Sequence, residues 1–290
     1  MRLVLPMPGN EAFAARLAAA SGAELGRVET RRFPDGETYV RLLSATKGRA
    51  VDLVCTLADP DEGFLRLAFA ADAARDLGAA SVTLVAPYLA YMRQDKRFHD
   101  GEAVTSRTFA RFISSTFDRL VTVDPHLHRY PGLEALYTIP GAVLHAAPLF
   151  SDWIRAHAPD ALVVGPDAES EQWAAEVARG AGVPHVAMTK QRLGDRQVRV
   201  SLPDLSAYAG RRPVLIDDIA SSGRTLVAAA EALRSLGFDP PDCLVVHALF
   251  APGAYEQVTA VTSRIVSTDS VAHPSNGIDL ATLMAVALAD

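Results

Sequence analysis

The sequence predicts an α/β fold with mainly parallel sheets, and three observations carry this prediction. Apolar runs of four to eight residues recur along the chain and alternate with longer stretches of helical periodicity. The runs are continuously apolar, which is typical of strands that are buried on both faces of a sheet. No low-complexity segment or structureless linker interrupts the alternation, so we expect helices to cover the sheets throughout.

The expected elements follow an order that repeats. The strands are expected at residues 51–57, 82–86, 120–123, 161–164, 213–216 and 243–250. The helices are expected at residues 62–77, 171–181 and 225–236. After both 51–57 and 161–164 come an acidic helix, a glycine-containing turn, a strand and a basic loop. We therefore interpret the chain as two copies of one α/β unit, with domains at residues 1–146 and 147–290.

The bulk composition argues against several classes of protein. Hydrophobic residues make up 49% and charged residues 21% of the 290 residues, the mix of a soluble globular protein. A formal net charge of −6 argues against a general nucleic-acid binder, and no stretch approaches the ~20 apolar residues of a membrane span. The N-terminus lacks a signal peptide's long apolar region, and Cys55 and Cys243 lie inside apolar runs. We expect a cytoplasmic protein with buried cysteines and without nucleic-acid or membrane partners.

The strongest chemical motif spans residues 214–225 and joins an expected strand to an expected helix. Asp217 and Asp218 stand at the carboxyl end of the strand, where open α/β sheets bind ligands. In the turn that follows, hydroxyl groups and helix N-terminal amides can bind phosphate, and glycine allows close backbone approach. The residues of this turn are Ser221, Ser222, Gly223, Arg224 and Thr225. An ordinary helix cap explains one Ser or Thr but not this combination, so the motif predicts a sugar-phosphate site.

Three further segments each allow a plain structural explanation beside a functional one. Residues 33–37 can be a simple Pro-Asp-Gly hairpin turn. The basic segment 87–97 can hold a polyphosphate or can be a solvated loop. Asp124, His126 and His128 follow a strand and can bind a metal ion, orient one another, or be ordinary core or surface residues.

The 214–225 motif resembles the ribosyl-phosphate-binding signature of the type I phosphoribosyltransferases. In that family the paired acids contact the ribose hydroxyls and the following loop holds the 5′-phosphate. The resemblance therefore implies that Asp217 and Asp218 bind ribose and that residues 221–225 bind phosphate. It also implies two similar phosphoribosyltransferase-like domains, each a mainly parallel sheet flanked by helices.

All four segments together resemble the ribose-phosphate pyrophosphokinases, over nearly the whole chain. The resemblance implies an ATP side in the first domain and a ribose 5-phosphate side in the second. The implied ATP-binding residues are Phe33, Asp35, Glu37, Arg93, Gln94, Asp95, Lys96 and His126. Because the 33–37 loop of the family typically reaches ATP across a subunit interface, a homodimer or a higher homo-oligomer is implied.

The same resemblance assigns the catalytic and metal-binding residues. Lys190 and Arg192 match the basic residues of the family's flexible catalytic loop. Asp124 and His126 match the metal–ATP site, and Asp167 matches a residue at the ribose phosphate and a second metal. The implied cofactor is Mg²⁺, a hard cation that prefers carboxylate, water and phosphate oxygens.

The chain departs from the common pattern of the family at three points. Glu169-Ser170 replaces a glycine pair, Pro125 replaces leucine, and Gln191 replaces the middle residue of a Lys-Arg-Arg loop. The first change affects the surroundings of Asp167 and therefore the expected metal geometry there. The length and the continuation at 193–196 resemble the short, archaeal-type members, so the allostery of the long class is not expected.

The implied reaction transfers the β,γ-pyrophosphoryl group of ATP to the C1 hydroxyl of ribose 5-phosphate, giving PRPP and AMP. Two alternatives stay open: a phosphoribosyltransferase that consumes PRPP, and a non-catalytic regulatory relative. A plain phosphoribosyltransferase has no use for the first-half segments. Retention of Lys190, Arg192, Asp124 and His126 argues against the regulatory relative.

Overall fold

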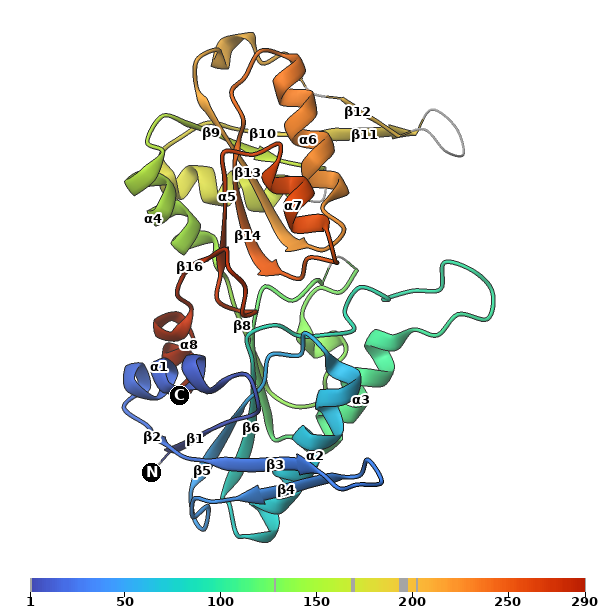
Figure 1. Cartoon of the computed structure of the whole chain (residues 1–290), viewed down its shortest axis with the longest axis vertical. Coiled ribbons are helices and arrows are strands. Elements are labelled where there is room, and N and C mark those ends of the chain that lie inside the picture. Colours follow the sequence, from blue (N-terminus) through green and yellow to red (C-terminus); the bar gives the residue numbers. More distant parts are fainter. Residues whose placement is uncertain (1, 128, 168–169, 193–197, 202, 290) are drawn as a thin grey trace. The chain divides into compact units, whose positions relative to one another are not determined.

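The computed structural model describes residues 2–127, 129–167, 170–192, 198–201 and 203–289. They form two compact units, one made of Met1–Leu144 with Asp279–Asp290 and the other of His145–Ile278. Each unit is built on a six-stranded sheet with helices on its faces (Figure 1), so the predicted α/β fold class is confirmed. Across the described ranges, no helix is both long and apolar enough to span a membrane.

The sheet of the first unit has the strand order β2-β1-β5-β6-β7-β8, and all neighbouring pairs are parallel. Its strands are β1 (Arg2–Pro6), β2 (Glu24–Leu25), β5 (Ala50–Val54), β6 (Ser81–Ala86), β7 (Arg119–Val123) and β8 (Gly141–Leu144). The helices are α1 (Glu11–Ser21), α2 (Pro60–Asp76), α3 (Thr105–Thr116), α8 (Ala281–Leu288) and the short η1 (Leu133–Ala135). A separate antiparallel hairpin consists of β3 (Val28–Arg32) and β4 (Thr38–Leu42).

The second unit has a parallel sheet of the order β10-β9-β13-β14-β15-β16. Its strands are β9 (Ala161–Gly165), β10 (His185–Ala187), β13 (Arg212–Ala220), β14 (Asp242–Ala248), β15 (Arg264–Thr268) and β16 (Asn276–Ile278). The helices are α4 (Ala147–His157), α5 (Glu171–Ala181), α6 (Arg224–Ser235), α7 (Ala254–Thr259) and the short η3 (Ser206–Tyr208). Its hairpin consists of β11 (Thr189–Arg192) and β12 (Val198–Ser201).

The two units repeat one topology, element for element. From β1 in the first unit, and from β9 after helix α4 in the second, each has a strand, a helix and an edge strand, then the inserted hairpin, and then the remaining four strands of its sheet. The predicted alignment of the repeat was nevertheless wrong. It matched the strand at 51–57 with that at 161–164, whereas β5 corresponds to β13, and β9 corresponds to β1. The mismatch arose because strand, helix and loop recur within each unit as well as between the units.

The C-terminal segment corrects the predicted domain division. A continuous second domain at 147–290 was expected, but Asp279–Asp290 belongs to the first unit. There α8 packs against α1 and against strands β7 and β8 (Figure 1), burying Met284 and Leu288 among other side chains. Hydrophobic periodicity predicts that a segment forms a helix, but it does not show against which of two sheets that helix packs.

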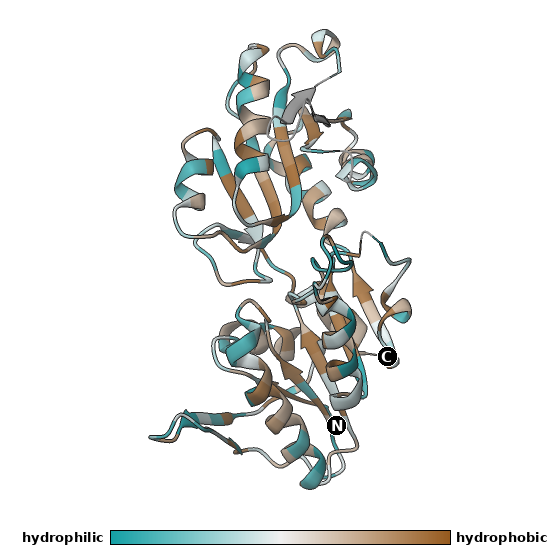
Figure 2. Ribbon diagram, turned by 90° about the vertical axis from the view of Figure 1, so that its right-hand side faces the viewer, coloured by the Kyte–Doolittle hydropathy of each residue, from teal (hydrophilic) through white to brown (hydrophobic). Residues whose placement is uncertain are grey.

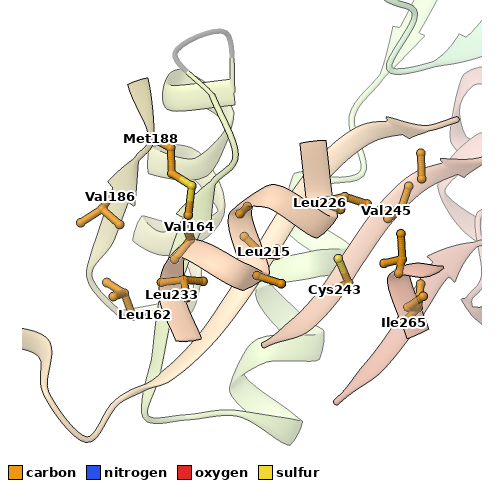
Figure 3. Close-up of a cluster of buried hydrophobic side chains, with 14 of the residues drawn as sticks. Leu162, Val164, Val186, Met188, Leu215, Leu226, Leu233, Cys243, Val245 and Ile265 are labelled. Carbon is orange, nitrogen blue, oxygen red and sulfur yellow. The ribbon is translucent and has the colours of Figure 1, made fainter. Parts of the chain in front are cut away.

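The cores of both units are formed by the strand residues that the apolar runs predicted. All residues of β9 and β14 are buried, and Figure 2 shows strongly hydrophobic strands lying among helices of mixed polarity. In the second unit, Leu215, Leu226 and Leu233 belong to a cluster formed by side chains of β9, β13, β14 and α6 (Figure 3). Cys55 and Cys243 are both free and buried, as expected, and burial raises the pKa of the Cys55 thiol to about 12.

Buried carboxylates paired with arginines join neighbouring strands in both sheets. In the second unit, Asp242 of β14 binds Arg212 of β13 at 3.1 Å and Arg264 of β15 at 3.0 Å. In the first unit, Asp52 of β5 accepts a bond of 2.8 Å from Arg2 of β1. The other oxygen of Asp52 has no hydrogen-bond partner in the described part of the chain, and burial raises the pKa of this carboxyl to about 6 despite the opposing effect of Arg2.

The raised pKa of Asp52 makes stability depend on pH. The folded state binds more protons than the unfolded state between about pH 4 and pH 6, so this contribution is present below pH 4 and is lost as the pH rises through 6. Asp52→Asn removes the titration. Its unfolding free energy relative to the wild type is therefore expected to rise by about 2 kcal/mol between pH 4 and pH 7.5.

Urea unfolding at the two pH values measures this difference. Asp72→Asn, which changes an exposed carboxylate on α2, is the matched control and should keep a constant difference from the wild type. A constant difference for Asp52→Asn as well would contradict the account.

Candidate functional site

The end of β13 and the start of α6 form the turn that the strongest motif predicted. Gly223 has a φ of 69°, and a Cβ added to it would lie 2.7 Å from the Val258 side chain, so both the backbone and the space require glycine. Gly223 is also the N-cap residue of α6 and has no side chain to bind the first amides of the helix. Because Ser222 and Arg224 are exposed, these amides and the hydroxyl groups beside them are suited to an anion.

Three of the predicted carboxylates interact electrostatically at this edge of the sheet. Asp217 and Asp218 lie near the carboxyl end of β13, and Asp167 follows the neighbouring strand β9. Burial raises the pKa of Asp217 well above its ordinary value, and the negative charges of Asp218 and Asp167 raise it further. Asp217 is half-buried, and burial and both neighbouring charges disfavour its ionised form. Such a group of acids favours ligands that donate hydrogen bonds or bring positive charge.

Ser170 holds the Asp167 turn in place. Its backbone amide donates to the Asp167 carboxylate at 3.2 Å, and its hydroxyl donates to the Asp167 carbonyl at 2.7 Å. A Cβ at Gly165 would lie 2.5 Å from this hydroxyl, so glycine is needed for the close approach. Two residues replace the glycine pair of the family. Glu169 lies outside the described residues, and Ser170 forms the hydrogen bonds to Asp167 given above. Asp and Ser side chains commonly bond to backbone groups a few residues away, so the Asp167 and Ser170 pair is the sequence signal for this turn.

The residues predicted for a flexible catalytic loop begin in a strand. Lys190 and Arg192 belong to β11, where Lys190 is opposite Val200 and Arg192 is opposite Val198 in the antiparallel ladder. The expectation of a loop at these two positions is therefore corrected. The continuation at 193–196, which we compared with the short members of the family, lies outside the described residues.

In the first unit, the predicted nucleotide segments follow the adjacent parallel strands β6 and β7. Asp124 comes directly after β7 with a φ of 35°, an unusual conformation for a residue other than glycine, and its amide donates to the Leu144 carbonyl at 2.9 Å. His126, two residues further on, is half-buried, and His128 lies outside the described residues. Because parallel strands end at the same edge of a sheet, both segments are available to one ligand.

The segment after β6 divides its predicted residues between solvent and interior. Arg93 and Lys96 are exposed and Gln94 is partly exposed. Asp95, in contrast, is buried and forms an ion pair with Arg129 at 3.1 Å. No sequence motif indicates Arg129, because ion pairs between distant loops have no local pattern.

The predicted turn at 33–37 connects β3 to β4. The Phe33 amide donates to the Glu37 carbonyl at 2.8 Å, and the Glu37 amide donates to the Asp35 carboxylate at 3.2 Å. The Arg31 guanidinium lies 4.6 Å from the centre of the Phe33 ring and 4.2 Å from that of Tyr39. Phe33 is thereby held by cation–π contact while 38% of its surface stays exposed, so its ring is available for stacking.

A divalent metal ion would find only some of its ligands among the side chains of this site. Within the described ranges, no three His, Cys, Asp or Glu side chains form a group that could hold a metal ion by themselves. Mg²⁺ usually binds through one or two carboxylates and takes its other ligands from water and substrate phosphates. That mode of binding fits the acids at this edge of the sheet, Asp167 after β9 and Asp217 and Asp218 within β13, because a cation would offset their negative charges.

Known proteins resemble the chain along almost its whole length. Residues 3–116 match the N-terminal domain of ribose phosphate pyrophosphokinase, and residues 132–275 match the phosphoribosyl transferase domain. The ribose-phosphate pyrophosphokinase of Methanopyrus kandleri is 36% identical over 94% of this chain and 94% of its own. The ribose-phosphate pyrophosphokinase of Thermococcus kodakarensis is 32% identical over 90% of this chain and 91% of its own.

A solved structure shows the same fold. The crystal structure of phosphoribosylpyrophosphate synthetase from Mycobacterium smegmatis superimposes with a TM-score of 0.86 and 22% identity, covering 99% of this chain and 97% of that one. The identities over nearly full length, together with the two matched domains, confirm the predicted resemblance. The chain belongs to the ribose-phosphate pyrophosphokinase family.

Proposed function

We propose that the protein transfers the β,γ-pyrophosphoryl group of ATP to the C1 hydroxyl of ribose 5-phosphate, producing PRPP and AMP. Membership of the family supports this reaction. The observation that carries it is the β13–α6 turn, where an acidic strand end directly precedes a helix start without a capping side chain. Acids suit the ribose hydroxyls, and the helix start suits the 5′-phosphate.

Each unit would bind one substrate. In the second unit, Asp217 and Asp218 accept hydrogen bonds from the ribose, and the 5′-phosphate binds the turn formed by Ser221, Ser222, Gly223, Arg224 and Thr225. In the first unit, exposed Arg93 and Lys96 bind the phosphates of ATP, with Gln94 and His126 beside them. The β3–β4 turn with Phe33, Asp35 and Glu37 would contact the adenine of a neighbouring copy, which makes the protein a homodimer or a larger homo-oligomer.

Transfer of a phosphoryl-type group depends mainly on in-line alignment of the two substrates and on neutralisation of the phosphate charge, and less on covalent catalysis by the protein. Lys190 and Arg192 would stabilise the negative charge of the transferring group. Bound Mg²⁺, held by Asp124 and His126 on the ATP side and by Asp167 on the ribose side, would neutralise phosphate charge. Buried free cysteines suit a reducing compartment, so we place the reaction in the cytoplasm.

Product analysis tests the proposed reaction. Purified protein with ATP, ribose 5-phosphate and Mg²⁺ is expected to form AMP and PRPP in equal amounts, and to form neither after chelation of the metal. Lys190→Ala is expected to keep ATP affinity and to lose at least about a hundredfold in turnover, as removal of one electrostatic contact to a transition state does. Release of pyrophosphate from PRPP and a base, or no reaction at all, would contradict the proposal.

Asp218→Asn separates the two substrates. Loss of one negative hydrogen-bond acceptor is expected to weaken ribose 5-phosphate binding about tenfold or more, with the ATP dissociation constant unchanged within about twofold. Isothermal titration with each ligand alone measures both constants. Asp239→Asn, which changes a carboxylate in the α6–β14 connection of the same unit, is the control. Selective loss of ATP binding in Asp218→Asn would refute the assignment.

A further inference from the structure

The loop after β6 is bound to the segment after β7 by polar contacts that belong to neither the sheet nor the helix packing. Asp95 is 8% exposed, and Arg129 Nε lies 3.2 Å from its Oδ1 and 3.1 Å from its Oδ2. The Tyr130 hydroxyl donates to the Asp95 backbone carbonyl at 3.1 Å. The loop that carries Arg93 and Gln94 is thus held through its one buried charged residue.

The start of α3 completes this arrangement. Ser106 is fully buried, and its amide donates to the Gln94 carbonyl at 3.3 Å. Its hydroxyl lies 3.4 Å from the Tyr130 hydroxyl. Loop residues 93–96, the first turn of α3 and residues 129–130 therefore meet in one polar cluster, which we call the Asp95 cluster.

The energetics explain why the cluster matters. A loop of mostly exposed polar residues buries little apolar surface to offset the entropy of its ordering. A buried carboxylate without its partner is strongly unfavourable, so loss of Arg129 leaves a charge that the loop can relieve only by moving Asp95 toward water. Such a movement would displace Arg93 and Gln94, the neighbours of Asp95 in the chain.

We propose that Asp95 and Arg129 are positioning residues for the nucleotide: they hold Arg93 and Gln94 beside the segment of Asp124 and His126 without touching ATP. The inference rests on the proposed function. It replaces the direct contact with ATP that the family resemblance implied for Asp95. Asp95 faces Arg129 and is buried, whereas the basic neighbours of Asp95 are exposed.

A double-mutant cycle tests the proposal. Asp95→Asn and Arg129→Ala are each expected to raise the ATP dissociation constant about tenfold, and the double variant about tenfold rather than a hundredfold, because both remove one interaction. The dissociation constant for ribose 5-phosphate should not change in these variants. Their KM for ATP should rise while kcat stays nearly constant. Arg129→Lys should restore part of the ATP affinity. Arg75→Ala, which removes a 3.0 Å ion pair to Asp118 at the opposite end of β7, is the matched control.

A measurement without ligand separates this inference from the proposed function. Amide hydrogen exchange of residues 93–97 is expected to be faster in Arg129→Ala than in the wild type or Arg75→Ala. Weaker ATP binding in Asp95→Asn but not in Arg129→Ala would show that Asp95 contacts the nucleotide, and unchanged exchange would equally overturn the proposal. A wild type that binds ATP but forms no AMP would refute only the proposed reaction.

Discussion

Repulsion among three carboxylates is the constraint on which the site in the second unit depends. The sheet brings the ends of β9 and β13 together, and burial, followed by the negative charges of Asp218 and Asp167, raises the pKa of Asp217. This arrangement costs stability unless a ligand supplies hydrogen-bond donors or positive charge. We expect a sugar with adjacent hydroxyl groups, together with a hard cation, to relieve this repulsion.

The repeated topology carries different residues at corresponding turns of the two units. The turn after β13 contains Gly223 and the hydroxyl residues around it, whereas the corresponding turn after β5 ends at Asp59, and α2 then begins with Pro60 and Asp61. Acids at that position would repel a phosphate, so of these two turns we expect the one after β13 to bind the anion. In the first unit the basic residues follow β6 instead. The inserted hairpins diverged likewise, one carrying Phe33 at its turn and the other Lys190 and Arg192 in its first strand.

Local patterns could be predicted from the sequence, and long-range partnerships could not. The β13–α6 turn was predicted because strand, acids, glycine and helix are contiguous, and the fold class followed from continuous apolar runs. The placement of α8 on the first unit and the correspondence of β5 with β13 depend on which sheet a segment reaches. The Asp95–Arg129 pair joins residues 34 positions apart. Asp95 is predicted as a ligand contact because it stands in the segment that resembles the family's Arg-Gln-Asp nucleotide-binding motif.

The titration of Asp217 tests the central claim most directly. Carboxyl carbon NMR of selectively labelled protein is expected to give a pKa clearly above the ordinary aspartate value. That pKa should fall in Asp218→Asn, which removes one neighbouring charge, and should fall again when ribose 5-phosphate and Mg²⁺ bind. An ordinary pKa in the free protein that neither the variant nor the ligands change would contradict the account.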